Sequence, residues 1–285
     1  MVLKDGRNRY YTDPLHDDFM VTPIQNFSKI DGEYKYIRKN VFARFFDWFI
    51  YYCLAVPYFK LHFLFRGIKV VGRKNVKKIK KQGYFIYSNH TQMLDAFLTA
   101  GFVAFPKRMM CVSHKTAVSI GVGKVFTKAL GAIPVAETIQ GIKHMNEAMK
   151  YYVGEKKRAM VIYPEAHMWS YFTGVREFPS ASFKFAVTVN APILPVAVTY
   201  KQRFRGFGKY KKERKPQIII NIGEPKFPDE SLTAKDNANM LRDYTYNYMK
   251  QKCENEDNYA YYNYIQVTEE ELEKLKLQVK NTDNK

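Results

Sequence analysis

A chain of 285 residues can bury one sizeable core, and this length predicts one domain or at most two. Hydrophobic residues make up 46% of the chain, which excludes wholesale disorder. Aromatic residues make up 16%, and the formal net charge is +19. A basic, aromatic-rich surface is typical of proteins that bind nucleic acid, an anionic membrane, or an acidic carrier protein or cofactor, and composition does not choose among these partners. The three cysteines, Cys53, Cys111 and Cys253, are widely spaced, which favours a reduced, cytosol-facing location over a disulfide framework or a zinc knuckle.

The first 66 residues precede the main apolar pattern. Residues 1–40 are polar and contain acids, so we expect an N-terminal extension folded onto the main body and no signal peptide. Residues 41–66 are strongly aromatic, but the uncharged stretch at 48–59 has only 12 residues, short of the roughly 20 that a spanning helix needs. Pro57 should also break a helix near its end. We therefore expect an interfacial aromatic helical segment at the membrane surface, with a buried core helix as the alternative.

From about residue 67, short apolar runs alternate with helical patterns. Helices are predicted from about residue 90 to 103 and from 138 to 153. The alternation predicts an α/β domain over residues 67–252, with a central, mostly parallel mixed sheet flanked by helices. Residues 253–285 are expected to form a C-terminal tail with a short charged helix. The predicted strands are residues 68–71, 84–87, 108–112, 132–135, 159–163, 193–199 and 217–222.

A histidine and an aspartate follow the predicted strand at 84–87. His90 and Asp95 are five residues apart, and in a regular helix their side chains would point about 140° away from each other. They can meet only if His90 lies on the strand-to-helix loop and folds back over the start of the helix. This arrangement would give an exposed imidazole whose tautomer is held by a carboxylate, as in a catalytic triad without its serine. Taken alone the pair is weak evidence, because a structural histidine is the commoner explanation of such a residue.

Four short patterns occur in a fixed order along the chain. The pattern Asn-His-x-x-x-x-Asp begins at Asn89, and a Gly-Ala-Ile-Pro-Val-Ala strand at residues 131–136 is followed by Glu137. Tyr-Pro-Glu-Ala-His-Met occupies residues 163–168, and an apolar strand with two prolines occupies residues 191–196. In order and spacing, over about residues 67–230, these patterns resemble the four motifs of the glycerolipid and lysophospholipid acyltransferases, whose bacterial members are 1-acyl-sn-glycerol-3-phosphate acyltransferases.

The resemblance implies an O-acyltransferase of phospholipid biosynthesis. Its donor would be acyl-ACP or acyl-CoA, and its acceptor the hydroxyl of a lysophosphatidate-like lipid. The resemblance makes His90 the general base with Asp95 as its partner, and it makes Glu165 the carboxylate that hydrogen-bonds the acceptor, with Asn89 in the same site. The acyl thioester is a substrate, so neither a cofactor nor a metal is expected.

Two motifs depart from the family pattern at positions associated with the acceptor phosphate. Glu137 replaces an arginine that ends the second motif, and residues 166–168 replace Gly-Thr-Arg. Arg176, Lys184 and His167 are the nearby residues that could take over, with a surface charge or a structural histidine as the alternative for each. Lys115 is a weaker candidate. Arg176 is preferred to a lysine because a forked guanidinium suits a phosphate.

The remaining predictions concern partners. The basic tract at residues 201–215 could contact anionic lipid, nucleic acid or an anionic donor, or could be a solvated hairpin. We expect a peripheral or monotopic protein on the anionic, cytoplasmic face of the membrane, with no nucleic-acid partner. A basic nucleic-acid-binding protein would explain the charge but not the ordered motifs. A catalytically inactive, lipid-binding family member would explain the altered motifs but not the intact His90 and Asp95.

Overall fold

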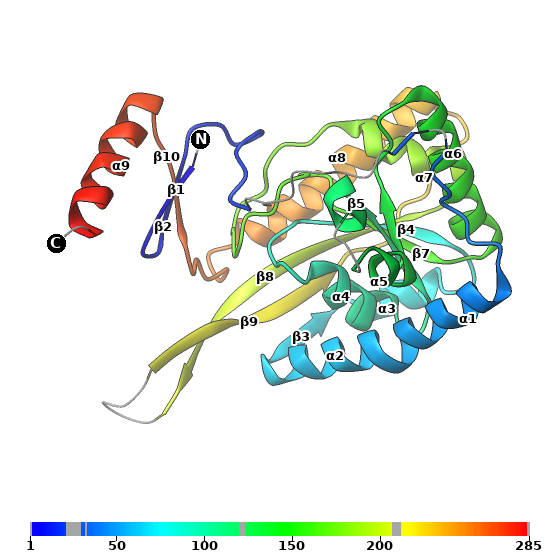
Figure 1. The fold of residues 1–285 in the computed structure, drawn as a ribbon, viewed down its shortest axis with the longest axis horizontal. Helices are drawn as coiled ribbons and strands as arrows, with labels where there is room; N and C mark the ends of the chain where they lie inside the picture. Colours follow the sequence, from blue (N-terminus) through cyan, green and yellow to red (C-terminus); the bar gives the residue numbers. More distant parts are fainter. Residues whose placement is uncertain (1, 21–29, 32, 120–122, 207–211, 284–285) are drawn as a thin grey trace.

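A seven-stranded mixed sheet forms the centre of the fold in a computed structural model, which describes residues 2–20, 30–31, 33–119, 123–206 and 212–283 (Figure 1). The spatial order is β3-β9-β8-β4-β7-β5-β6. Five neighbouring strands from β8 to β6 run parallel, whereas β9 is antiparallel to β8 and parallel to β3. All seven predicted strands and the α/β class are confirmed. The strands are β3 (Ile68–Val71), β4 (Tyr84–Ser88), β5 (Met109–Ser113), β6 (Ala132–Pro134), β7 (Ala159–Ile162), β8 (Ile193–Arg205) and β9 (Lys212–Ile222).

Helices cover both faces of this sheet. Successive side chains of a strand point to opposite faces, so a strand such as β4, whose residues are all buried, needs cover on both sides. On β4, Phe85 and Tyr87 pack in the core beneath α6 (Ile139–Met149), α7 (Lys184–Val189) and α8 (Ala234–Cys253). Tyr84 and Ile86 pack on the other side, beneath the helix at residues 41–65 and α4 (Asp95–Thr99). The remaining helices are α3 (Arg73–Lys78), α5 (Gly123–Ala129), π-helical extensions of α4 and α6 (Ala100–Ala104 and Lys150–Glu155), and 3-10 turns at Lys115–Val118 and Ser180–Phe183.

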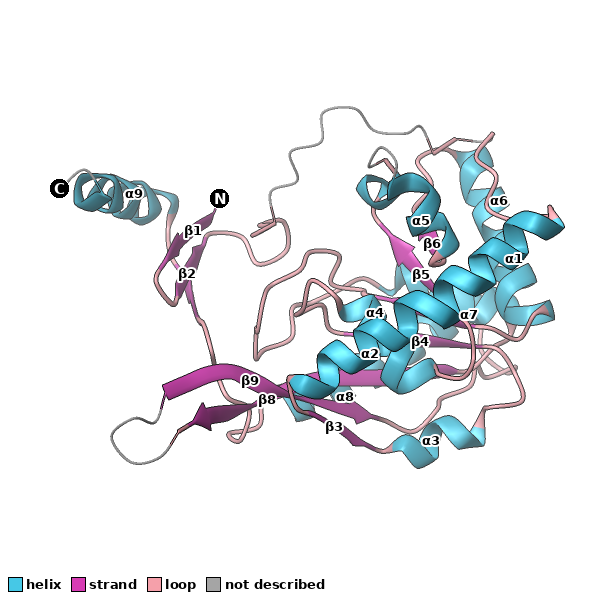
Figure 2. Cartoon of the chain, turned by 60° about the horizontal axis from the view of Figure 1, so that its bottom comes forward, coloured by secondary structure: helices cyan, strands magenta, loops and turns pink. Residues whose placement is uncertain are grey.

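The aromatic segment forms one continuous helix of 25 residues, which crosses in front of the sheet in Figure 2. It consists of α1 (Val41–Phe49), a π-helical stretch (Ile50–Ala55) and α2 (Val56–Phe65). The prediction that Pro57 breaks the helix is therefore wrong. Pro57 lies in the first turn of α2, directly after the wider π-helical turn, where a missing N–H and the proline ring are tolerated. By length and composition alone the helix is long and apolar enough to cross a bilayer. The sequence did not predict this length, because the uncharged stretch at residues 48–59 has only 12 residues.

A small second sheet joins the two ends of the described chain. Strands β1 (Val2–Asp5) and β2 (Asn8–Tyr11) form a hairpin, and β10 (Asn263–Gln266) pairs parallel to β2. The last described helix, α9 (Glu269–Asp283), follows β10 and lies where the sequence predicted a short helix in the tail. The N-terminal extension and the C-terminal tail, expected as separate segments, thus form one unit (Figure 1).

The basic tract extends the antiparallel pair of β8 and β9 into a long arm (Figure 2). Residues 207–211 of this tract lie outside the described residues. The arm also contacts the chain's N-terminal part, because Arg7 pairs with Glu213 at 2.5 Å. The hairpin geometry expected as one alternative for the tract is therefore present in its described residues.

Candidate functional site

His90 and Asp95 meet at the carboxyl end of β4. His90 lies on the loop after the strand, and Asp95 begins α4, so the two side chains face each other as the sequence predicted. The His90 Nδ1 atom is 3.0 Å from Asp95 Oδ2, and this oxygen also accepts hydrogen bonds from the backbone N–H groups of Thr91 (2.8 Å) and Gln92 (2.9 Å). Because a carboxylate can only accept hydrogen bonds, Nδ1 carries the proton and the lone pair of the neutral ring lies on Nε2. The imidazole is thus oriented as a base.

The ring of His90 is held from one side by an aromatic neighbour. Tyr163 follows β7, which pairs with β4 in the sheet, and its ring stacks on the imidazole with centroids 4.4 Å apart. Burial raises the pKa of Tyr163 well above its usual range, so its hydroxyl stays protonated. His90 itself keeps 24% of its side chain exposed, whereas Asp95 keeps 1%. One nitrogen of the ring is therefore fixed and the other remains accessible.

Asn89 anchors the loop that carries His90. Its side-chain oxygen accepts a hydrogen bond from Val198 N (2.8 Å), and its amide nitrogen donates to Val198 O (3.0 Å). The residue is fully buried. The resemblance implies that Asn89 binds substrate; in the structure its side chain is buried and ties the loop after β4 to β8.

Glu165 and Arg176 form a buried pair beside the dyad. Glu165 Oε2 is 3.4 Å from Arg176 Nη2, and their side chains are 0% and 2% exposed. Burial raises the pKa of Glu165 and lowers the pKa of Arg176, and each group's charge opposes the shift of the other. Glu165 Oε1 has no hydrogen-bond partner among the described residues.

The guanidinium of Arg176 is enclosed by the protein, although its Nε has no hydrogen-bond partner among the described residues. It donates to the carbonyl oxygens of His167 and Pro14 and lies over the ring of Trp169, 4.8 Å from its centroid. The sequence favoured Arg176 as the phosphate contact. The structure instead buries it under the loop of residues 165–168, because a distant carbonyl and an indole ring complete its surroundings.

A pocket of about 170 Å³ opens at the accessible side of His90. His167 lies in its wall, with Nδ1 3.4 Å from Asp18 Oδ2. Ala166 has φ of 63°, a left-handed conformation that favours glycine, the residue type that the family motif has at this position. The remaining lining residues are Met20, Met93 and Met168.

The other two predicted phosphate contacts lie elsewhere. Lys115 follows β5 and forms an ion pair with Glu137 (2.6 Å), the residue that replaces the family's arginine. Both are at the same carboxyl edge of the sheet as His90 but outside the walls of its pocket. Lys184 is exposed at the start of α7 and does not line the pocket either.

Sequence reasoning missed the contribution of the chain's N-terminal part to this site. Asp18 and Met20 line the pocket, and Trp169 Nε1 donates to the carbonyl of Asp17 (2.9 Å). The ring of Phe19 packs edge-on against Trp169. No local sequence pattern marks this contact, because Asp17 and Trp169 are about 150 positions apart.

Two further properties bear on chemistry. No cluster of three or more His, Cys, Asp or Glu side chains suited to a metal occurs among the described residues. Burial raises the pKa of the Cys111 thiol to about 12 and also raises that of Cys253. Thiolate chemistry at neutral pH is therefore disfavoured at these two cysteines.

Comparison with known proteins locates a family within the chain. The acyltransferase family matches residues 67–199, which contain His90, Asp95, Glu165 and Arg176. A solved structure that resembles the chain is the 1-acyl-sn-glycerophosphate (LPA) acyltransferase PlsC from Thermotoga maritima, with 19% identity and a TM-score of 0.48 over 76% of this chain and 95% of that chain. No curated protein matches the chain. The family match confirms the resemblance found in the four motifs.

Proposed function

We propose that this chain, which carries an acyltransferase-family domain at residues 67–199, moves a fatty acyl chain from acyl-ACP or acyl-CoA to the hydroxyl of a lysophosphatidate-like acceptor. The observation that carries this proposal is the orientation of His90. Its Nδ1 is fixed by Asp95, and the ring borders a pocket in which an acceptor hydroxyl can approach Nε2.

The proposed reaction begins with proton transfer. A neutral hydroxyl is a weak nucleophile, so Nε2 of His90 takes its proton as the oxygen attacks the thioester carbonyl. Asp95 stabilises the imidazolium that forms. When the tetrahedral intermediate collapses, the C–S bond breaks and the proton on Nε2 passes to the departing thiolate. An ester and a free thiol are the products, and His90 returns to its starting state.

The head of the acceptor would contact the loop at residues 165–168. His167 lines the pocket and can donate to an oxygen of the acceptor. Glu165 Oε1 and Asp95 Oδ1 are both buried acceptor atoms without a partner among the described residues, and we propose that Glu165 Oε1 receives a glycerol hydroxyl because it lies on this loop. Because this oxygen is covered, binding must shift the loop. Arg176 then acts by holding Glu165 in place.

The acceptor phosphate would lie at the rim of the pocket. The pocket walls contain neither lysine nor arginine among the described residues, so a phosphate inside them would meet no full positive charge. We favour Lys115, which lies at the same edge of the sheet, as the cation that contacts the phosphate. Its ion pair with Glu137 would have to break for this contact to form. Lys184 is the alternative. Either contact would place the phosphate toward solvent or toward lipid headgroups on the cytoplasmic face of the membrane, where we expect the protein to act.

A thioester-consumption assay of the purified protein tests this function. Acyl-ACP and acyl-CoA are each supplied with glycerol 3-phosphate, lysophosphatidate or other lysophospholipids, and the ester product is identified by mass. We expect thioester loss matched by ester formation with one acceptor class. Loss of thioester without ester would indicate hydrolysis, and no loss with any pair would favour a catalytically inactive lipid-binding protein.

A further inference from the structure

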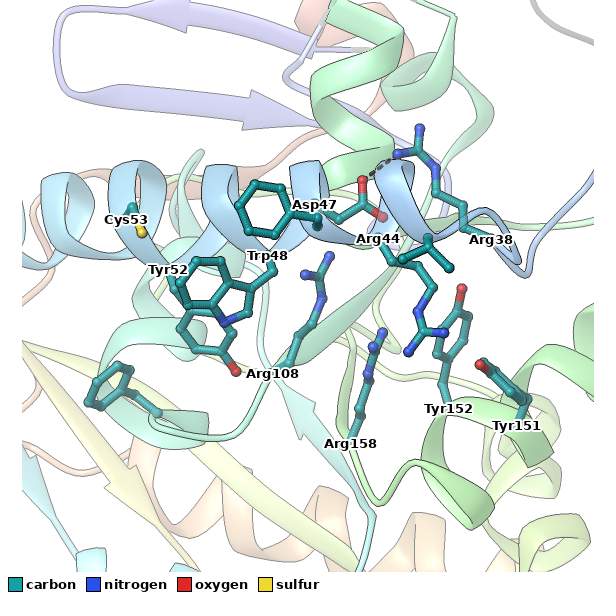
Figure 3. Close-up of a pocket in the computed structure, with 13 residues that line it drawn as sticks. Arg38, Arg44, Asp47, Trp48, Tyr52, Cys53, Arg108, Tyr151, Tyr152 and Arg158 are labelled. Carbon is teal, nitrogen blue, oxygen red and sulfur yellow. Dashed lines mark hydrogen bonds and ion pairs between the residues drawn. The ribbon is translucent and has the colours of Figure 1, made fainter.

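A second, larger pocket of about 900 Å³ lies between α1 and the sheet. Four arginines and one acid line it: Arg38, Arg44, Arg108, Arg158 and Asp47. We call it the arginine pocket. Figure 3 shows the side chains of Arg44, Arg108 and Arg158 reaching into the same space, while Arg38 turns toward Asp47.

The arginine pocket lies at the opposite edge of the sheet from His90. Arg108 directly precedes β5 and Arg158 directly precedes β7, so both mark the amino ends of parallel strands. His90 follows the carboxyl end of β4, a neighbour of β7. A strand of four or five residues spans roughly 13–17 Å, so the two pockets are separated by about the length of one strand of the sheet. The arginine pocket is therefore distinct from the proposed acceptor site.

Positive charge in the arginine pocket exceeds negative charge. Arg38 pairs with Asp47, and within the described part of the chain no carboxylate forms an ion pair with Arg44, Arg108 or Arg158. Arg108 Nε is buried without a hydrogen-bond partner, although Nη2 donates to Ala129 O (2.6 Å). The pKa of Arg108 is lowered first by burial and then by the charge of Arg158. An anion between these guanidiniums would offset their mutual repulsion and satisfy the unpaired donor.

Two more cations adjoin this pocket. Lys35 and Lys128 line a smaller neighbouring cavity, which shares Arg38, Arg108 and Arg158 with the arginine pocket. Forked guanidinium groups bind phosphate through parallel hydrogen bonds, which favours a phosphate over a simple carboxylate or halide.

The surroundings of the arginine pocket are apolar and exposed. Phe42 and Phe45 on α1 are 86% and 66% exposed, and Trp48 lines the pocket itself. The same helix exposes further large apolar side chains along its length, including Leu54, Tyr58, Leu61, Leu64 and Phe65. A soluble anion would leave this surface in water, whereas the acyl chains of a lipid would cover it.

We propose that the arginine pocket binds the phosphate headgroup of an anionic phospholipid of the membrane, with the lipid's acyl chains against the exposed aromatic face of the helix at residues 41–65. The site would hold the protein on the membrane at the edge of the sheet opposite His90. It uses charge complementarity and an adjoining apolar surface, and it takes no part in acyl transfer.

The first test removes the unpaired charges. In sedimentation with phosphatidylcholine vesicles containing phosphatidylglycerol, Arg44→Gln together with Arg158→Gln should weaken binding by roughly tenfold or more, from about fivefold per arginine near an anionic surface. The control, Lys235→Gln with Lys250→Gln, removes the same charge from α8 on the other face of the sheet, and should weaken binding by less than about twofold. Equal losses in the two variants would overturn the proposal.

The second test reports on the pocket directly. Cys53 is exposed and lines the pocket, whereas Cys111 and Cys253 have raised pKa values, so a thiol reagent should modify Cys53 first. Vesicles containing phosphatidylglycerol should slow this modification more than pure phosphatidylcholine vesicles do, and Arg44→Gln alone should reduce the difference by about fivefold. Equal protection by the two vesicle types would contradict the proposal, as would equal protection by soluble glycerol 3-phosphate.

Folding and activity separate this proposal from the proposed function. Arg44 is exposed, and its side chain makes no hydrogen bond or ion pair with the described residues, so Arg44→Gln should keep the thermal midpoint of the native protein. Its turnover on a detergent-dispersed acceptor should also be unchanged, because the arginine pocket lies away from His90. If the protein proves inactive in every acyl-transfer assay, protection of Cys53 by vesicles can still be measured, so the two proposals can fail independently.

Discussion

The two edges of the central sheet carry two kinds of charged site. At the carboxyl edge, charges occur in internal pairs: His90 with Asp95, and Glu165 with Arg176. At the amino edge, the arginine pocket has one internal pair and three guanidiniums without a carboxylate partner among the described residues. Internal pairs fix the position and protonation of a group, which proton transfer requires. Unpaired charges attract a partner from outside, which binding to an anionic surface requires. The comparison predicts that mutations at the carboxyl edge change turnover or folding, whereas mutations at the amino edge change where the protein binds.

His90→Ala should give the largest effect. Loss of the proposed general base should lower turnover by roughly 10²–10⁴-fold, while the fold is kept because the ring is partly exposed. His144→Ala, on the far side of the sheet in α6, is the matched control and should retain normal turnover. Turnover is measured by ester formation and folding by circular dichroism. Near-normal activity of a folded His90→Ala protein would remove the basis of the comparison at this edge.

Arg176→Gln tests whether the buried pair supports the fold. Removing one partner of a buried ion pair should lower the free energy of unfolding by about 3–5 kcal/mol. Lys78→Gln breaks the exposed pair with Glu224 and should cost about 1 kcal/mol or less. Both values come from urea unfolding.

The same variant has a pH signature. Burial already raises the pKa of Glu165 in the wild type, and Arg176 opposes this rise, so without Arg176 the pKa of Glu165 in the native state should rise further above that in the unfolded state. The stability of Arg176→Gln protein should then fall as pH rises from the ordinary glutamate pKa through the raised native one. Glu165→Gln in the same background should remove this slope. A pH-independent difference between wild type and Arg176→Gln would show that the pair does not act through the Glu165 charge.

Asp95→Asn should have a smaller effect on turnover than His90→Ala. One oxygen of Asp95 accepts from His90, Thr91 and Gln92, so an asparagine oxygen placed there keeps the tautomer of the ring. What is lost is the negative charge that stabilises the imidazolium, and we expect roughly 10–10²-fold lower turnover. The loss should appear in kcat rather than in the KM of either substrate. A loss equal to that of His90→Ala would mean that the asparagine amide has turned toward the ring and imposed the wrong tautomer.

His167→Ala should give the smallest effect. If the ring contacts the acceptor, the KM for the acceptor should rise by a few-fold, in line with one hydrogen bond, and the KM for the donor should stay constant. His16→Ala is the matched control, since His16 also pairs with an aspartate but is 80% exposed. An equal change in both KM values would place His167 outside the acceptor site.

Much of the fold was predictable because buried parallel strands leave a clear pattern. The seven strands are predicted by apolar runs bounded by turn residues. Helix geometry shows that His90 and Asp95 can meet only if His90 lies outside the helix, and His90 does lie on the loop before α4. The helix-breaking tendency of proline led to a wrong prediction at Pro57, because the π-helical turn before it accommodates the proline ring.

What the sequence did not predict depends on contacts between distant segments. Arg176 is buried by Pro14 and Trp169. Its position in the sequence does not show whether its side chain is buried or exposed on the surface, where it could contact a phosphate. The arginine pocket combines residues 38 to 158, which only the strand order brings together. The sheet of β1, β2 and β10 consists of short polar strands, which lack the apolar alternation that marks a strand.

The pairing of β2 with β10 also sets the order in which the molecule is completed. Asn8 and Asn263 are 255 positions apart, so their contact has one of the greatest sequence separations possible in this chain. Tyr264, from β10, stacks on Trp169 and packs against Phe19, next to the residues that line the His90 pocket. During synthesis, the central sheet has all its strands once residue 222 has emerged, whereas the segment around Phe19 gains its last support some forty residues later. The central sheet can therefore form before the His90 pocket is closed, and the pocket is completed as a late, separate step of folding.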